Sequence, residues 1–272
     1  PRSPSSKTPI SSVEPKRYFD AIEIYNGVWG DDAEPVLKDW FSLLSLGLTP
    51  CGTAVSDTHG AFRRNAGEPR TYIGVDALAE TRDTTVLLQN SKACRAFGSS
   101  GPLLNISVQS GLRQASFGEL LSPAADPVIL EVHAQTPSWY GLSVLEVFIN
   151  QSYKNPGAKE DDSDYQPFHA DLTLPLTPVA RQYPNGAESL VYEQSLELAP
   201  ELLGDQDAWV VVRVLGPESS QHPVALHPAR ITINPQADTP ETFLQASRTL
   251  IPFAFSNPVF LDRDGDGEYS PR

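Results

Sequence analysis

The chain has 272 residues, of which 40% are apolar, and it carries a formal net charge of -14. A chain of this length and composition is large enough for a packed core and is more typical of two modest domains than of one. The negative charge repels phosphate backbones and no stretch gathers Lys and Arg, so a nucleic-acid partner is not expected. The sequence lacks a run of about 18 apolar residues, so we expect a soluble protein without a membrane partner.

The N-terminal part of the chain predicts a lead-in and then a strand, a helix and a second strand. Residues 1–17 are rich in Ser, Pro and Lys without an apolar period, which is typical of a linker or a disordered segment. The run Phe19–Tyr25 is rich in strand-forming residues and ends at an Asn-Gly turn signal, so we predict a strand. Apolar residues recur at helical spacing across Pro35–Leu46, and the run Gly52–Val55 follows as the second strand.

The same alternation continues to about residue 102. We predict a second helix over Thr84–Lys92, a strand over Cys94–Phe97 and a break over Gly98–Pro102, which is rich in Gly, Ser and Pro. Strands that alternate with helices indicate a parallel α/β sheet or barrel. We therefore expect residues 18–102 to form an α/β region.

Beyond Pro102 the pattern changes to short apolar runs between turn-forming residues, without a helical period. The seven runs are the predicted strands Leu103–Val108, Val128–Ala134, Ser143–Ile149, Phe168–Leu174, Leu190–Leu196, Trp209–Val214 and Arg230–Ile233. Strands in this number and spacing are typical of a β-sandwich. The expected fold class is thus α/β plus all-β, with a β-sandwich over residues 103–255 and an Asp-rich tail over residues 256–272.

Asp57 and His59 form the first candidate site. They follow the Gly52–Val55 strand inside a glycine-containing loop, which is the position where α/β barrels hold their catalytic groups. Residues two apart in an extended segment point the same way, so the carboxylate and the imidazole can bind one ion, and this ligand pair suits Zn, Mn or Fe. Taken alone, an Asp-x-His pattern more often marks a helix-capping Asp beside a surface His.

Six segments that follow one another along the chain change this interpretation: FDAIEIYNG, KDWFSLLSLG, CGTAVSDTHG, GEPRTYI, AFGSSGPLL and AFSNPVFLDRDGDG. Together they resemble the PHP superfamily, named for polymerase and histidinol phosphatase domains, and more closely its carbaryl-hydrolase-like branch of metallohydrolases. The resemblance covers about residues 18–104. It continues weakly to the end of the chain, where the last segment is similar to the C-terminal signature of that branch.

The resemblance implies a distorted β/α barrel that holds two or three divalent metals and whose last ligand pair is an Asp-x-His, here Asp57 and His59. Residues 18–102 would then be the C-terminal part of that barrel. The chain departs from the family pattern, because the opening His-x-His pair and the middle His and Glu ligands have no counterpart in it. One Asp and one His hold a metal only loosely, so the chain alone is expected to be inactive or nearly so.

The resemblance also implies roles around the metal site. Glu23 and Asn26 match a pocket-lining motif, and the alternative for Glu23 is a solvated or salt-bridged strand residue. Arg70 and Tyr72 either bind a substrate oxyanion or pack the loop. The remaining histidines all fall in the predicted β region, and we expect them to be structural or surface groups: His133, His169, His222 and His227.

The start of the chain bears on the missing ligands. The sequence begins at Pro1 and contains no Met, so we expect it to be part of a longer primary translation product. A removed secretory signal and a fragment cut from a longer protein are the two explanations. The absent ligands favour the fragment, with the N-terminal part of the barrel as its missing partner.

Two further features concern stability and location. Cys51 and Cys94 belong to no metal-binding pattern, so they either form a disulfide between neighbouring strands or remain buried free thiols. Asp262, Asp264 and Asp266, followed by Glu268, match the first half of an EF-hand loop. The alternatives there are a structural Ca²⁺ site and a solvated acidic tail. A disulfide, a calcium-type loop and an acidic surface favour a secreted or periplasmic location.

Two hypotheses for the function follow. The first is a metal-dependent hydrolase that cleaves ester, carbamate or phosphoester bonds of a small-molecule substrate with metal-activated water. The second is a non-catalytic secreted β-sandwich binding module with a calcium-stiffened C-terminal loop.

Overall fold

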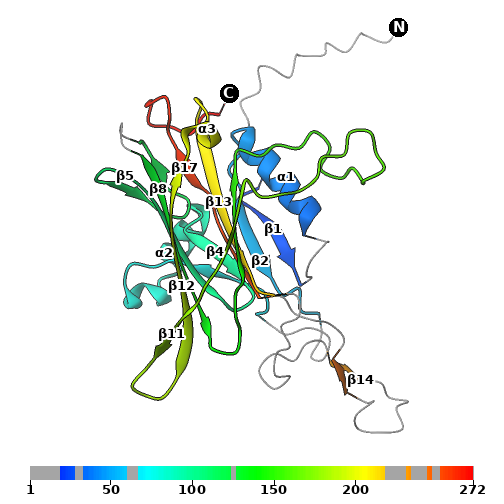
Figure 1. The fold of residues 1–272 in the computed structure, drawn as a ribbon, viewed down its shortest axis with the longest axis vertical. Coiled ribbons are helices and arrows are strands. Elements are labelled where there is room, and N and C mark those ends of the chain that lie inside the picture. The colour runs from blue at the N-terminus through cyan, green and yellow to red at the C-terminus, as the bar shows by residue number, and fades with distance from the viewer. Residues whose placement is uncertain are drawn as a thin grey trace.

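A computed structural model describes residues 19–27, 33–59, 67–123, 127–217, 231–233, 244–246 and 252–271, the side chains of 231–233 and 244–246 excepted. Over these residues the chain is a strand-rich, mixed α/β protein built in three layers (Figure 1). The predicted lead-in of residues 1–17 lies outside them. In this described part, no helix combines the length and apolar character that crossing a membrane requires.

An eight-stranded sheet forms the middle layer. Its main path consists of β10 (Leu172–Pro175), β9 (Val144–Ile149), β13 (Ala208–Leu215), β16 (Phe253–Ser256), β4 (Ala96–Ser99) and β3 (Arg70–Ile73). Two more strands join it, β17 (Val259–Leu261) beside β13 and β7 (Leu120–Leu121) beside β17. β13 is buried on both faces: Val210 and Val212 enter one core, whereas Trp209 and Val211 enter the other.

A five-stranded antiparallel sheet covers one face of the middle sheet. Its strands, in spatial order, are β11 (Val179–Gln182), β12 (Glu188–Leu198), β8 (Val128–Pro137), β5 (Leu103–Ser110) and β6 (Arg113–Ala115). Buried and partly exposed side chains alternate along β8, and the buried ones meet the middle sheet in a core dominated by Leu and Val. These two sheets agree with the predicted β-sandwich, although β3, β4 and β17 come from outside the predicted range of residues 103–255. The short helix α3 (Pro200–Leu203) precedes β13, and β14 (Ile231–Ile233) pairs antiparallel with β15 (Leu244–Ala246) as a two-stranded sheet.

A strand–helix–strand unit covers the other face of the middle sheet. β1 (Ala21–Asn26) and β2 (Cys51–Val55) pair in parallel, and α1 (Glu34–Ser45) connects them, as the sequence predicted. The helix has Pro in its first turn, where the missing N–H costs nothing. Its apolar stripe is buried in an aromatic core, with the Phe41 ring centre 4.8 Å from that of Trp209 on β13.

Side chains join β2 to the middle sheet. The Asn257 amide oxygen accepts from Gly52 N at 2.7 Å, and its NH₂ group donates to Gly52 O at 3.1 Å and to Ala96 O at 2.9 Å. The Thr71 hydroxyl accepts from Ala54 N and donates to Ala54 O, both at 2.9 Å. These two side chains therefore satisfy backbone groups along β2 that a neighbouring strand would otherwise satisfy.

A disulfide between Cys51 and Cys94 is the third connection, so the first of the two cysteine alternatives holds in the structure. The two Cα atoms are 5.1 Å apart, and both residues are buried. Cys51 is the first residue of β2, and Cys94 lies between α2 (Thr84–Lys92) and β4. The helix α2 spans the predicted range. It follows the 3₁₀ helix η3 (Leu78–Arg82), and the Asp83 carboxylate caps it by accepting from Thr85 N at 2.9 Å.

The expected parallel sheet does not extend to the third predicted strand. β4 pairs antiparallel with β3 on one side and with β16 on the other, so the prediction that it continues a parallel α/β sheet was wrong. The reason is non-local pairing, because β16 comes from near the end of the chain and β3 was not predicted. The middle sheet consequently draws strands from the three predicted regions 18–102, 103–255 and 256–272.

Candidate functional site

Asp57 and His59 lie just beyond the carboxyl end of β2. His59 Nε2 contacts Asp57 Oδ1, so the two side chains point at each other. Asp57 has a left-handed backbone conformation, φ 46°, which turns the chain out of the strand. The His59 side chain is 79% exposed and that of Asp57 28%, so the pair is accessible to solvent. Within the described residues, this pair belongs to no larger group of carboxylates, imidazoles or thiols.

Parallel pairing brings Glu23 and Asn26 to the same edge as Asp57. The register sets Glu23 opposite Thr53 and Asn26 opposite Val55, which is two residues before Asp57. Asn26 Nδ2 donates a hydrogen bond to Glu23 Oε2 at 2.7 Å. Four of the six residues predicted around the metal site, Glu23, Asn26, Asp57 and His59, thus belong to β1 and to the segment that follows β2.

Arg70 and Tyr72 lie on β3, on the face opposite to Thr71. Since the Thr71 hydroxyl contacts β2, and side chains alternate along a strand, Arg70 and Tyr72 point away from β2. The Arg70 Cζ atom lies 5.6 Å from the centre of the Tyr72 ring, which stacks on Phe97 at 4.8 Å. These contacts agree with the packing alternative and not with a place beside Asp57.

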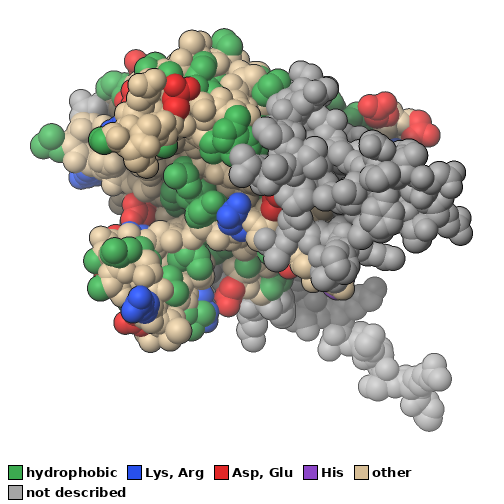
Figure 2. All heavy atoms as spheres, turned by 90° about the horizontal axis from the view of Figure 1, so that it is seen from below, with side chains coloured by type: hydrophobic (Ala, Val, Ile, Leu, Met, Phe, Trp, Pro, Cys, Tyr) green, Lys and Arg blue, Asp and Glu red, His purple; other side chains and the backbone are tan. Residues whose placement is uncertain are grey.

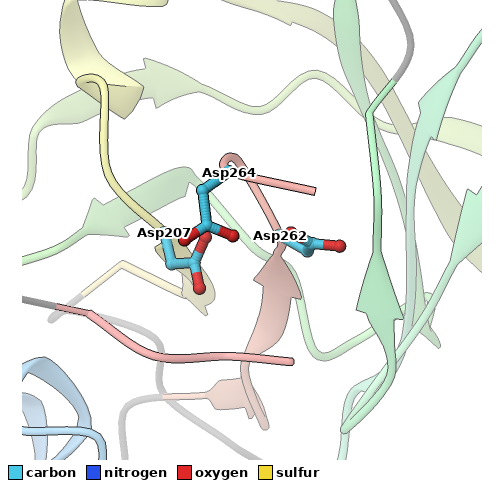
Figure 3. A group of neighbouring side chains, drawn as sticks. All are labelled: Asp207, Asp262 and Asp264. Carbon is cyan, nitrogen blue, oxygen red and sulfur yellow. The ribbon is translucent and has the colours of Figure 1, made fainter. Parts of the chain in front are cut away.

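A second cluster joins Asp207, Asp262 and Asp264 (Figure 3). Antiparallel pairing of β13 with β17 sets Ala208 opposite Leu261, so Asp207 and Asp262 are neighbours at the ends of these strands. One carboxylate oxygen from each of the three residues lies within 4.8 Å of the others. Carboxylate oxygens in such an arrangement are the ligands that Ca²⁺ prefers.

Backbone N–H groups organise this loop around the two buried carboxylates. Asp262 is 2% exposed and accepts from Gly265 N at 2.6 Å, from Gly267 N at 3.0 Å and from the Ser122 hydroxyl at 2.6 Å. The Ser122 hydroxyl, helped by the backbone N–H groups, holds the pKa of Asp262 below its usual range despite burial. Asp207 accepts from Arg263 N and from Ser270 N, each at 2.7 Å. The Asp262 carboxylate is therefore stabilised as an anion.

The predicted calcium ligands are only partly brought together. Asp262 and Asp264 belong to the cluster, whereas Asp266 and Glu268 are exposed and outside it, and Asp266 Oδ1 accepts from Glu268 N at 2.8 Å. Asp207 is the third member of the cluster in place of Asp266 and Glu268, and the sequence did not predict it. It lies far from the Asp-rich segment in the chain, and its only signal was an acidic residue directly before a strongly apolar strand.

A polar cavity of about 490 Å³ adjoins this cluster. Its lining includes Asp207, Tyr269, Asn150 and Ser45. The Tyr269 hydroxyl donates to Leu44 O at 2.9 Å, and burial raises the pKa of Tyr269. This contact fixes the segment after the Asp-rich loop against the end of α1.

The other histidines give no additional metal ligands in the described part of the chain. His133 lies on β8, and His169 is exposed with its Nδ1 atom 3.2 Å from Pro167 O. His222 and His227 lie outside the described residues. On the face shown in Figure 2, the described Lys and Arg side chains are dispersed among acidic, polar and apolar ones, so charge on that face does not mark a site.

Comparison with known proteins adds no assignment. The chain matches no family model, and it has no significant match among curated proteins or solved structures.

Proposed function

We propose that this chain is the C-terminal part of a PHP-type metal-dependent hydrolase. The observation that carries the proposal is the edge formed by β1 and β2, where Asp57 and His59 contact each other after β2 and the parallel strand β1 carries Glu23 and Asn26. Strand–helix–strand units with parallel pairing place catalytic groups at this edge. The substrate class is a small molecule with an ester, carbamate or phosphoester bond.

The donor set of the pair fits a divalent metal. Asp57 offers an anionic oxygen and His59 a neutral imidazole nitrogen, which together suit Zn, Mn or Fe. A bound ion of this kind supplies a nucleophile by lowering the pKa of its water to about 7. Two ligands do not complete a coordination shell, so the remaining ones would come from outside the described residues, from the N-terminal part of the barrel.

The residues of this chain would hold and orient the ion. Asp57 would balance its charge, and His59 would bind through one ring nitrogen while an acceptor fixes its other N–H. Asn257, Thr71 and the disulfide of Cys51 hold β2 against the middle sheet. They thereby hold the strand that leads to Asp57 and His59 in place. The β-sandwich would thus serve as a rigid support for the barrel.

A secreted or periplasmic location belongs to the same proposal. The disulfide supports it, because such bonds persist mainly in oxidising compartments. Free thiols at Cys51 and Cys94 in the protein isolated under non-reducing conditions would contradict it.

Metal content tests the hydrolase proposal. The full-length protein is purified without added metal, and its Zn, Mn and Fe are counted by elemental mass spectrometry beside Asp57→Ala and His59→Ala. We expect metal in the parent protein, its loss in both variants, and loss of activity on nitrophenyl ester or phosphate substrates. Asp161→Ala and His169→Ala, in exposed loop positions, are the matched controls and should keep the metal. Equal metal in all five proteins would refute the assignment of Asp57 and His59.

The Asp207, Asp262 and Asp264 cluster supports a second candidate, a non-catalytic binding module with a calcium-stiffened loop. Here Ca²⁺ would stabilise the end of the sandwich without taking part in chemistry. Thermal unfolding with and without Ca²⁺ tests this, with Asp264→Asn against Asp266→Asn. Stabilisation lost only in Asp264→Asn, in a protein without Zn, Mn or Fe, would favour the module over the hydrolase.

A further inference from the structure

A β-bulge places Glu23 and Asn26 on one face of the two-stranded sheet. Glu23 lies opposite Thr53 and Tyr25 opposite Ala54, so Ile24 is the extra residue in β1. In a regular strand, residues three apart point to opposite faces, and the bulge removes this offset. The hydrogen bond from Asn26 to Glu23 is the consequence.

This face lies opposite to the aromatic core. Tyr25 points into the core, where its ring centre is 4.0 Å from that of Phe253. Asn26 is the next residue and therefore points the other way, on the same face as Val55, its partner in β2. Bulges occur next to active sites, where they redirect a side chain.

The amide oxygen of Asn26 is buried and has no hydrogen-bond partner among the described residues. Its identity as the oxygen is fixed, because the other arm of the amide faces the Glu23 carboxylate, which only accepts, and must be the NH₂ group. Buried carbonyl oxygens in folded proteins nearly always have a partner. The partner of Asn26 in β2 is Val55, which lies two residues before Asp57. The unpartnered Asn26 oxygen therefore points to a ligand that supplies a hydrogen-bond donor or a positive charge.

We propose that Asn26 Oδ1 is a further ligand of the divalent ion held by Asp57 and His59, and that Glu23 is the positioning residue that orients the amide. This inference rests on the proposed function. Neighbouring strands lie about 4.8 Å apart and a strand advances about 3.3 Å per residue. Asn26 is the last residue of β1 and Asp57 lies two residues beyond its partner Val55, so side chains from these adjacent strand ends can reach one ion. Two oxygens and one imidazole nitrogen form a ligand set that suits Mn²⁺ or Zn²⁺.

Mn²⁺ binding to the full-length protein tests the role of Asn26. Free Mn²⁺ is followed by electron paramagnetic resonance during titration of the metal-free protein and of Asn26→Leu, Asn26→Asp and Glu23→Gln. We expect Asn26→Leu and Glu23→Gln to bind about 10- to 100-fold more weakly, whereas Asn26→Asp keeps an oxygen ligand and retains binding. Asn155→Leu is the matched control, because the Asn155 amide also donates to a carboxylate, Asp164 Oδ2 at 3.0 Å, on an exposed loop.

The outcomes separate this inference from the proposed function. Unchanged Mn²⁺ affinity in Asn26→Leu, together with loss in Asp57→Ala, overturns the role of Asn26 and leaves the Asp57 and His59 site standing. Absence of Mn²⁺ binding in the parent protein overturns both. Thermal unfolding in EDTA checks folding, and we expect Asn26→Leu to unfold close to the parent, because Oδ1 has no partner among the described residues and the hydrogen bond that Nδ2 loses, to Glu23, is exposed. If Asn26→Leu does not fold, retained binding in Asn26→Asp with weakened binding in Glu23→Gln supports the inference, and any other combination refutes it.

Discussion

Replacing Asn257 by Ala tests whether one buried amide holds β2 against the middle sheet. The substitution removes three hydrogen bonds, one from Gly52 N and two to the carbonyl oxygens of Gly52 and Ala96. All three backbone partners belong to buried residues, so water cannot easily replace the amide. At about 1 kcal/mol for each bond, we expect Asn257→Ala to lower the free energy of unfolding by about 3 kcal/mol.

Urea unfolding at fixed protein concentration measures this change. Asn155→Ala removes one hydrogen bond from an exposed amide and should alter stability by no more than about 0.5 kcal/mol. Hydrogen exchange gives a local readout, because the Gly52 N–H loses its acceptor and should exchange faster than in the parent protein. A loss below about 1 kcal/mol with unchanged exchange at Gly52 would show that the amide does not clamp β2.

Two other predictions concern the disulfide and the Asp-rich loop. Replacing Cys51 and Cys94 by Ser opens a loop with a sequence separation of 43 residues. The chain-entropy estimate gives a loss of about 4 kcal/mol in the free energy of unfolding, which urea unfolding measures. A loss below about 1 kcal/mol would contradict this prediction. The lowered pKa of Asp262 means that its ionised form stabilises the fold above its ordinary pKa of 3.8, and that this contribution disappears as pH falls through the lower folded value. The stability difference between the parent and Asp262→Asn should therefore be constant near neutral pH and shrink below about pH 4, and a difference that grows on acidification would refute the sign.

Local patterns predicted the two longer helices, α1 and α2, and most strands, because their signals lie within the segments themselves. The stripe of Leu37, Trp40, Phe41 and Leu44 determines α1, and Asp83 determines the start of α2. The direction in which β4 pairs could not be read in this way. Its partner β16 is contributed by a segment near the end of the chain, and no local residue pattern encodes that choice.

The same distinction applies to the candidate sites. Asp57 and His59 could be singled out from the sequence because they lie two residues apart in one short segment, although a left-handed turn at Asp57, and not an extended backbone, accompanies their contact. Asp207 was missed because only the β13 and β17 register brings it beside Asp262. The contribution of Asn26 also depended on the structure, since the bulge at Ile24 decides which face of the strand its side chain occupies.

The two candidate metal sites lie at opposite ends of β2, and this separation limits how they can interact. The segment after the Asp-rich loop packs near the start of the strand, where Tyr269 bonds to Leu44 O and Pro271 lies against Gly47. Asp57 follows the other end, after a strand of 5 residues, which spans about 17 Å at 3.3 Å per residue. No single ion can take ligands from both sites across that distance. Their ligand chemistry differs as well, since three carboxylates suit Ca²⁺ whereas a carboxylate with an imidazole suits Zn, Mn or Fe. A Ca²⁺-selective chelator should therefore act on the Asp207 cluster alone, and any effect on metal held at Asp57 would have to pass through the packing of β2.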